Sequence, residues 1–241
     1  NLILNYHPEY WSDEQYNNIL NNSNNIISLA GNVATYSVYY SDNNRLLERT
    51  EKYRCVNDYP RITGSLWDSR GYLCFSPYKI VKKSIFFIHI RKDTFGNKCL
   101  GKWKSCKGTC EGHPGGNRGT LLYCNRDGIS GHESDKAINK NDIIASDSYT
   151  YENSTLQEDY KGADMIYINY KNGKKIFSTG SIVFCGGLFI DKEIDNLVLN
   201  VFTRFRFNKI IVFGNTKNYK KINEIMNKLG FSFKYWDTGL I

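Results

Sequence analysis

The segment GNVATYSVYYSDNN, at residues 31–44, strongly limits what this chain can fold into. Both of its alternating faces carry aromatic or β-branched side chains, with Val33, Thr35, Ser37 and Tyr39 on one and Ala34, Tyr36, Val38 and Tyr40 on the other. A half-buried strand would keep one face polar, so this strand needs cover on both sides. The turn-forming cluster at 41–44 ends it. The cover is either a second layer of the same chain or another copy.

Composition describes a globular chain that is unusually rich in tyrosine. The 241 residues suffice for one sizeable domain or two small ones, and 41% are hydrophobic and 23% charged. Aromatic residues make up 15%, including 18 tyrosines. Tyrosine suits covered surfaces that keep hydrogen bonds, which favours extensive interfaces. The alternative is an aromatic-rich core in a chain of biased composition.

Several classes of partner are not expected. No apolar run reaches about 18 residues, so no transmembrane helix and no membrane partner are predicted. The start lacks the basic and apolar regions of a signal peptide. A net charge of +8 permits contact with phosphate or nucleic acid, but the basic residues are scattered in pairs. We therefore expect a solvated basic surface and no specific nucleic-acid partner.

The N-terminal third is predicted to be an arm followed by strands. Ser12, with Gln15 three positions later, has the spacing of a helix capping box. Residues 1–30 are interpreted as an arm with one helical piece, because the Asn-rich sequence after the cap is a poor helix former. Strands are expected at 33–40, 45–56, 72–76 and 84–91, and the run SIFFIHI in the last is read as buried on both faces.

The remainder is predicted to be one domain over 31–241 with a Cys/Gly-rich loop insert at about 96–162. Strands return at 164–170, with a hairpin through Asn172 and Gly173, and SIVFCGGLFI follows as a buried strand. A helix is expected at 193–207. The segments KIIVFG, NYKKINEIMNKLG and FSFKYW then indicate a strand, a helix and a last strand. The pattern predicts an α+β, mainly antiparallel fold.

The insert holds a group of soft metal ligands. Cys106, Cys110, His113 and Cys124 lie within nineteen residues and could form a tetrahedral zinc site. Their spacing does not match a CxxC knuckle, and a disulfide between two of them is an alternative. Free thiols are the default, and no metal is assigned.

No motif indicates a catalyst. The candidates for a histidine base are His7, His89, His113 and His132, and none stands in a nucleophile–base pattern. The Gly-rich EGHPGGNRG lacks the spacing of a phosphate loop. No catalytic residue is assigned, and a non-enzymatic protein is predicted.

Residues 182–236 resemble the carboxyl-terminal half of a GNAT acetyltransferase, in their strand and helix order and in the NKLGF ending. That family holds acetyl-CoA on a Gly-rich turn. Here the turn reads DKEIDN, and Asp191, Glu193 and Asp195 would repel a pyrophosphate. An acyltransferase is therefore the alternative function.

A second resemblance is carried by SDEQYNN (12–18), GNVATYSVYYSD (31–42) and EKYRC (51–55). Together they are similar to the polyhedrin of cypoviruses, the protein that forms crystals around virus particles in infected insect cells. The resemblance covers about forty-five residues, and the Cys-rich insert is foreign to it.

That resemblance implies a structural matrix protein with a β-sandwich flanked by helices and a projecting N-terminal helical arm. It implies trimers, a crystal lattice that embeds virus particles in the host cytoplasm, dissolution at alkaline pH, and nucleotides held in the lattice without residues we can assign. Other copies would cover the second face of the 31–44 strand. The expected self-assembly contacts are Leu4, Tyr6, Tyr10, Trp11, Tyr16, Tyr36, Tyr39 and Tyr40.

Overall fold

The structure is a computed structural model of the chain. It describes residues 2–6, 8–40, 46–50, 62–67, 75–91, 94–96, 129–131, 134–147, 163–182, 184–188, 191–205, 209–214 and 232–237.

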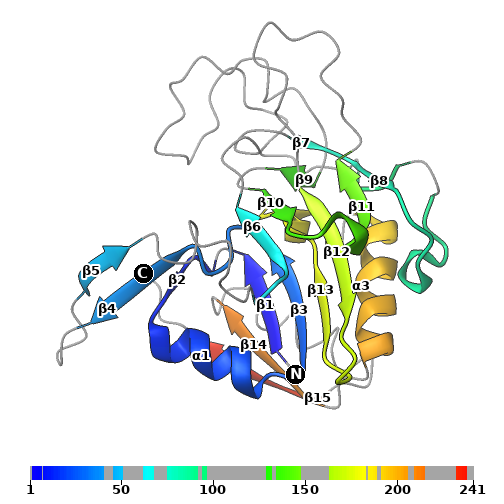
Figure 1. The fold of residues 1–241 in the computed structure, drawn as a ribbon. Coiled ribbons are helices and arrows are strands. Elements are labelled where there is room, and N and C mark those ends of the chain that lie inside the picture. The colour runs from blue at the N-terminus through cyan, green and yellow to red at the C-terminus, as the bar shows by residue number, and fades with distance from the viewer. Residues whose placement is uncertain are drawn as a thin grey trace, which may run out of the picture.

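A six-stranded mixed sheet forms the centre of the molecule (Figure 1). Its order is β1 (Leu2–Tyr6), β3 (Asn25–Ala30), β13 (Lys175–Ser178), β12 (Asp164–Asn169), β11 (Ile143–Asp147) and β8 (Tyr78–Ile80). The first three strands run parallel to one another, and the remaining pairs are antiparallel. The predicted hairpin between β12 and β13 is confirmed.

Within the described part of the chain, four smaller sheets accompany the central one. They are β2 (Tyr10–Trp11) with β4 (Tyr36–Tyr40) and β5 (Leu46–Thr50); β6 (Ser65–Trp67) with β10 (Asp135–Ala137); β7 (Phe75–Ser76) with β9 (Ser130–Gly131); and β14 (Lys209–Gly214) with β15 (Ser232–Asp237). The last pair is parallel, and β14 runs beside β1. The strands expected from KIIVFG and FSFKYW are thus confirmed.

Helix α1 (Asp13–Asn22) begins with the predicted capping box. The Ser12 hydroxyl accepts a hydrogen bond from the Gln15 amide at 3.2 Å, and the Gln15 side chain accepts one from the Ser12 amide at 2.9 Å. Two of the otherwise unpaired amides of the first turn are satisfied in this way. Only Tyr16 in this Asn-rich helix is buried.

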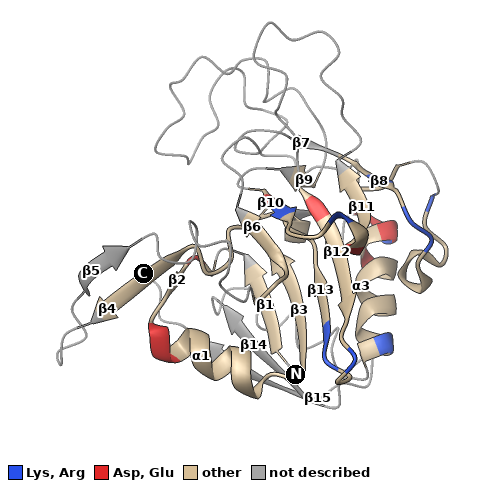
Figure 2. Cartoon of the chain, viewed as in Figure 1, with Lys and Arg blue, Asp and Glu red and all other residues tan. Residues whose placement is uncertain are grey.

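Helix α3 (Lys192–Phe205) confirms the helix expected at 193–207. Asp191 caps it, because its side chain accepts a hydrogen bond from the Glu193 amide at 3.0 Å. Acidic residues occupy its first turn and Arg204 its last, so the charges oppose the helix dipole (Figure 2). Its apolar face packs on the central sheet through Ile194, Leu197, Val201, Phe202 and Phe205.

The two faces of the sheet have separate cores. The core under α3 contains Ile27, Met165 and Phe177, together with Phe86 from the loop after β8. The opposite face carries a smaller cluster that joins Leu4 and Ile26 to Trp11 and Tyr16. Residues at the start of the chain thus belong to the molecule's own interior.

Several predictions about elements fail or are not confirmed. The strand expected at 33–40 begins only at Tyr36, because residues 31–34 form a turn. The projecting arm is not confirmed, because β1 pairs with β3 in the central sheet. The run SIFFIHI is not a strand but contains the 3₁₀-helix η2 (Ile85–Phe87), and SIVFCGGLFI contains the 3₁₀-helix η4 (Phe184–Gly187). In SIFFIHI the chain curls over α3, which buries Phe86 and leaves Ile85 and Ile88 exposed. The combination of strands and helices fits the α+β prediction, while the β-sandwich is not confirmed.

Two predictions fall outside the described residues, namely the helix expected from NYKKINEIMNKLG and most of the 96–162 insert. Within the described part, none of the helices has the length and apolar character required to cross a membrane.

Candidate active site

Polar residues gather where the three parallel strands of the sheet end. The chain leaves β1 toward Glu9, leaves β3 toward Asn32 and leaves β13 toward Gly180. Neighbouring parallel strands bring their carboxyl ends to one edge, and this is where open α/β sheets bind ligands. These three turns form the candidate site.

Glu9 supplies a buried carboxylate at this edge, with 8% of its surface exposed. Its Oε1 accepts a hydrogen bond from Asn32 Nδ2 at 2.7 Å. Its backbone is fixed as well, because the Glu9 carbonyl accepts the Tyr36 amide at 3.1 Å and the Pro8 carbonyl accepts the Ala34 amide at 2.9 Å. The turns after β1 and β3 are thus joined directly.

The turn after β3 is strained. Asn32 and Ala34 have φ values of 54° and 52°, the left-handed region that non-glycine residues rarely adopt. Asparagine tolerates it better than most residues, whereas alanine does not. The side-chain carbonyl of Asn32 accepts a hydrogen bond from the Thr35 hydroxyl, which orients the amide toward Glu9. Such strain concentrates at functional sites, where the surrounding contacts enforce it.

Asp135 supplies a second buried carboxylate, with 1% of its surface exposed. Its Oδ1 accepts the Asn32 backbone amide at 2.7 Å, and its Oδ2 accepts the Ser65 hydroxyl at 3.4 Å. Ser65 in turn shares a 2.9 Å hydrogen bond with Thr63. Asn32 therefore contacts both carboxylates, one through its side chain and one through its backbone.

Gly180 holds Asp135 against the end of β13. The Asp135 amide donates to the Gly180 carbonyl at 2.7 Å, and Gly180 has a φ of +65°. A Cβ at this position would lie 2.6 Å from the Asp164 carbonyl oxygen and 3.1 Å from that of Asp135. No other residue fits without moving the backbone, so glycine is required for this close approach.

Three hydroxyl groups, within β3 and at the end of β13, lack partners among the described residues. The Oγ atoms of Ser28 and Ser178 and the Oγ1 of Thr179 are fully buried without a hydrogen bond. Ser28 and Ser178 occupy matching positions in the two paired strands. Buried polar groups are normally paired, so these hydroxyls mark an unusual polar interior beneath the turns that hold Asn32 and Gly180.

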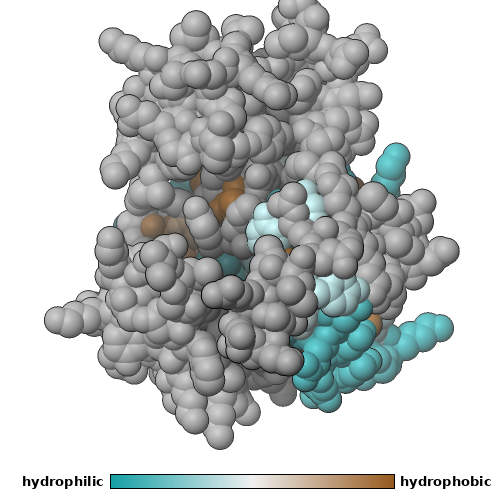
Figure 3. Space-filling view, turned by 90° about the vertical axis from the view of Figure 1, so that its left-hand side faces the viewer, coloured by the Kyte–Doolittle hydropathy of each residue, from teal (hydrophilic) through white to brown (hydrophobic). Residues whose placement is uncertain are grey.

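Figure 3 shows the side of the molecule where β2, β4 and β5 lie. Described hydrophobic atoms are visible near the middle of this face, with described hydrophilic surface below and to one side. The turns that contain Glu9 and Asn32 directly precede β2 and β4 in the chain, and these two strands pair.

The predicted zinc ligands Cys106, Cys110, His113 and Cys124 lie outside the described residues. Among the residues that the structure does describe, no cluster of three or more histidine, cysteine, aspartate or glutamate side chains could hold a metal.

The predicted self-assembly residues have different environments. Leu4, Trp11 and Tyr16 are buried within their own chain. Tyr10 is 47% exposed and its ring stacks on that of Tyr36, with the ring centroids 5.4 Å apart. Tyr39 is 40% exposed. Tyr6 and Tyr40 lie in β1 and β4, and their side chains are not described. The structure contains a single chain, so contacts between copies stay a prediction.

Sequence reasoning missed Glu9, Asn32 and Asp135. The signal for Glu9 was available, because the apolar LILNY directly before HPE could have been interpreted as a strand that delivers a carboxylate to a sheet edge. Asn32 and Asp135 are 103 positions apart, and no spacing rule joins them.

The family model for "N,N-dimethylformamidase beta subunit-like, C-terminal" matches residues 1–196, which include all the residues of the candidate site. The chain belongs to this family. A search of curated proteins found no match.

This membership corrects the functional predictions made from the sequence. The similarity to cypovirus polyhedrin is wrong, as are the viral matrix function, the occlusion-body location in infected cytoplasm and the non-enzymatic assignment, because the matched family is named for an enzyme. The GNAT alternative is not supported either. The polyhedrin-like segments are short and rich in Asn and Tyr, and such composition produces similarity without kinship.

Proposed function

We propose that this chain contributes an active site for the hydrolysis of small N-substituted carboxamides, with the Glu9 carboxylate as the base that activates water. The observation that carries the proposal is the buried Glu9 carboxylate, held by Asn32 at the carboxyl ends of three parallel strands. Membership of a family named for N,N-dimethylformamidase supplies the substrate class.

The reaction requires three actions on an amide. A base removes a proton from water as the oxygen attacks the carbonyl carbon, donors stabilise the oxyanion, and the leaving amine receives a proton when the C–N bond breaks. Glu9 can perform the first action and return the proton in the last. For N,N-dimethylformamide the products are formate and dimethylamine, and water is the only co-reactant.

Asn32 acts as a positioning residue in this scheme. Its Nδ2 holds Glu9 Oε1 at 2.7 Å, and the Thr35 hydroxyl fixes the opposite end of the amide. Asp135 in turn holds the Asn32 backbone amide. The strained turn is therefore tied to both sides of the site, which keeps the Glu9 carboxylate in one orientation.

The family name also refers to a beta subunit, so we propose that the chain works beside a second kind of subunit. The assay for hydrolysis therefore uses the purified protein with any chain that co-purifies with it.

The test of the function is release of dimethylamine from N,N-dimethylformamide, compared between the parent protein, Glu9→Gln and Glu14→Gln. Glu14 lies exposed in α1, so its substitution makes the same chemical change away from the site. Glu9→Gln should lower kcat by about 100-fold or more, because it removes the base while keeping the shape. Glu14→Gln should retain the parent rate.

Circular dichroism and the thermal midpoint serve as checks that Glu9→Gln remains folded. Equal kcat values for Glu9→Gln and the parent would show that Glu9 takes no part in catalysis. If the protein releases no amine from N-alkyl formamides or N-alkyl acetamides, the proposed substrate class is wrong.

A further inference from the structure

The loop that follows β8 and packs beside α3 exposes large aliphatic side chains. Val81, Ile85 and Ile88 are 56%, 51% and 41% exposed. Leu199 on the adjoining surface of α3 is 37% exposed. Large apolar side chains that are exposed close together on a surface mark interaction sites, and three of these four lie within eight residues of the chain. We propose that residues 79–91, here called the docking loop, bind a protein subunit whose contact surface has an apolar centre and an acidic rim.

The docking loop is anchored rather than loose. Phe86 is fully buried and contacts the rings of Tyr167 and Phe177, with centroids 4.9 and 5.5 Å away. From α3, Asn200 Nδ2 donates to the carbonyls of Phe86 and Ile88 at 2.9 and 3.2 Å. These contacts fix the backbone of the loop at Phe86 and Ile88.

A second anchor closes the far end of the docking loop. Glu193 accepts hydrogen bonds from the Arg91 backbone amide at 2.8 Å and from Arg91 Nε at 2.7 Å. This pairing raises the pKa of the Arg91 guanidinium, chiefly through the hydrogen bond to Glu193. Between the anchors, His89 is held at a φ of 62°. The loop is therefore pre-organised, which lowers the entropy cost of binding.

The short helix η2 separates buried from exposed side chains. Ile85 begins η2 and Ile88 directly follows its end, and both are exposed, whereas Phe86 between them is fully buried. The sequence SIFFIHI thus serves two surfaces. Its aromatic side chain holds the loop, and its isoleucines face outward.

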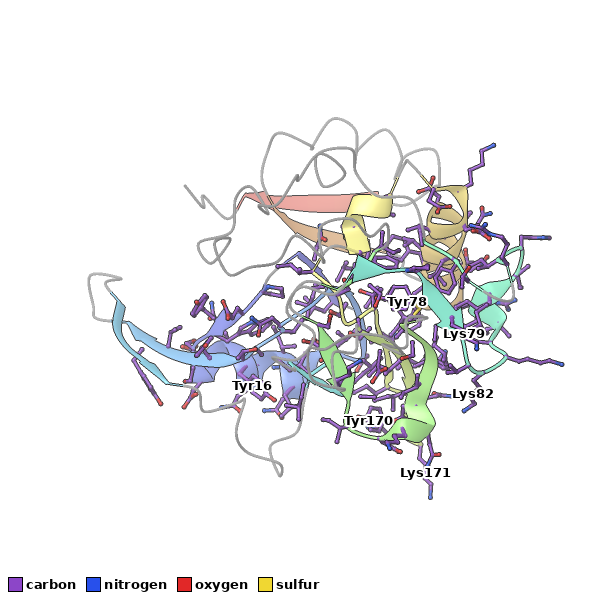
Figure 4. All side chains as sticks on the ribbon, turned by 90° about the horizontal axis from the view of Figure 1, so that it is seen from above. Tyr16, Tyr78, Lys79, Lys82, Tyr170 and Lys171 are labelled. Atoms are coloured by element: carbon purple, nitrogen blue, oxygen red, sulfur yellow. The ribbon has the colours of Figure 1, made fainter. Side chains whose placement is uncertain are left out.

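Charge identifies the kind of partner. Lys79, Lys82 and Lys83 are all exposed in the same segment of the chain, and Lys82 Nζ donates a hydrogen bond to the Asn141 carbonyl at 3.3 Å. Figure 4 shows Lys79 and Lys82 on the outer side of the molecule, away from Tyr78 in its interior, and Figure 2 shows the basic segments around this loop. An acidic rim complements these lysines. A second copy is disfavoured because each chain carries a net charge of +8.

The inference rests on the part of the proposed function that gives the chain a second subunit. The amide hydrolysis assay is independent of it, so the two can fail separately. The experiment compares the parent protein with Ile85→Ser/Ile88→Ser and with Lys82→Glu/Lys83→Glu. Tyr39→Ser, an equally exposed position on β4, is the matched control.

Native mass spectrometry of the protein from the cells that make it should show a stoichiometric companion chain. Hydrogen exchange should then show protection of residues 79–91 in the complex relative to the separated chain. Both double variants should weaken the complex at least about tenfold, since truncated anchor residues cost this much at interfaces. Tyr39→Ser should bind as the parent does.

Three results would overturn the inference. They are the absence of a companion chain, a companion that protects other residues instead, and a companion retained by both double variants. Binding of the parent alone to vesicles of seven parts neutral and three parts anionic lipid would assign the docking loop to a membrane. Loss of a homodimer in the variants would assign it to a second copy.

Discussion

The face of the central sheet under α3 and the edge where β1, β3 and β13 end are built from opposite chemistry. Under α3 the side chains are apolar and their rings interlock, with Phe86 in contact with Tyr167, Phe177 and Phe205. At the strand ends the interior is polar and the backbone is strained at Asn32 and Ala34. Both regions are buried, so burial alone does not distinguish them.

The difference assigns separate tasks to the two regions. Apolar packing lowers the free energy of the folded chain, whereas buried carboxylates and left-handed residues raise it. A region that raises the free energy persists because the rest of the fold compensates, and such exceptions to local rules are typical of functional sites. Substitutions under α3 should therefore change stability, and substitutions of the polar side chains at the strand ends should change activity more than stability.

The largest expected effect is on stability, from Phe86→Ala. Removing a fully buried ring that contacts three other rings should lower the free energy of unfolding by about 3–5 kcal/mol. Ile85→Ala, at the neighbouring exposed position, should change it by less than about 0.5 kcal/mol. Urea denaturation measures both values. Similar losses for the two variants would show that the buried ring of Phe86 contributes no more to stability than the exposed side chain of Ile85.

Gly180→Ala should come next. The new Cβ would meet the Asp164 carbonyl at 2.6 Å in a left-handed conformation, and we expect a loss of about 2–4 kcal/mol. Gly173→Ala is the matched control, because Gly173 also has a positive φ, of +86°, but has open space around it. Its loss should stay near 1–2 kcal/mol, roughly the cost of the conformation alone. Equal thermal midpoints for the two variants would show that the close contact between a Cβ at position 180 and the Asp164 carbonyl does not destabilise the fold.

Asn32→Gly should separate stability from activity. Glycine keeps the left-handed turn but removes the amide that holds Glu9, which should cost roughly 1–3 kcal/mol of stability. In Asn32→Gly the kcat for amide hydrolysis should fall by a larger factor than in Thr63→Ala, which changes the periphery of the same network. A fully active Asn32→Gly variant would show that Glu9 needs no positioning by Asn32.

The sequence predicted the elements whose causes are local. The capping box of α1, the apolar face of α3 and the Asn172–Gly173 hairpin each depend on residues a few positions apart, and each is confirmed. The Asp135 contact with Asn32 joins segments far apart in the chain, so no local pattern contains it. The left-handed backbone at Ala34 is equally invisible in the sequence, because nothing about alanine favours it.

Two apolar runs also led to wrong predictions of secondary structure. SIFFIHI and SIVFCGGLFI have the composition of buried strands, yet both contain 3₁₀ turns. In SIFFIHI a tertiary contact overrides the local preference, because Asn200 holds the carbonyls of Phe86 and Ile88. The opposite error occurred at β1, where a short strand was taken for an arm because its parallel partner follows only after a helix.

The smallest expected effect is a pH dependence that separates two tyrosines near the sheet. Burial raises the pKa of Tyr167 above its ordinary value near 10. The folded chain then holds the phenol proton more tightly than the unfolded chain, so stability falls as pH rises above about 10. Tyr170 behaves in the same direction, because burial and then the Asp142 carboxylate raise its pKa. Replacing either residue by Phe should make the alkaline decline of the thermal midpoint shallower. Added salt should weaken only the contribution of Asp142, so the effect of Tyr170→Phe should shrink in salt while that of Tyr167→Phe should not. Thermal melts at low and high salt across the alkaline range measure this. A decline that Tyr167→Phe leaves unchanged would show that ionisation of this phenol is not coupled to unfolding of the aromatic core.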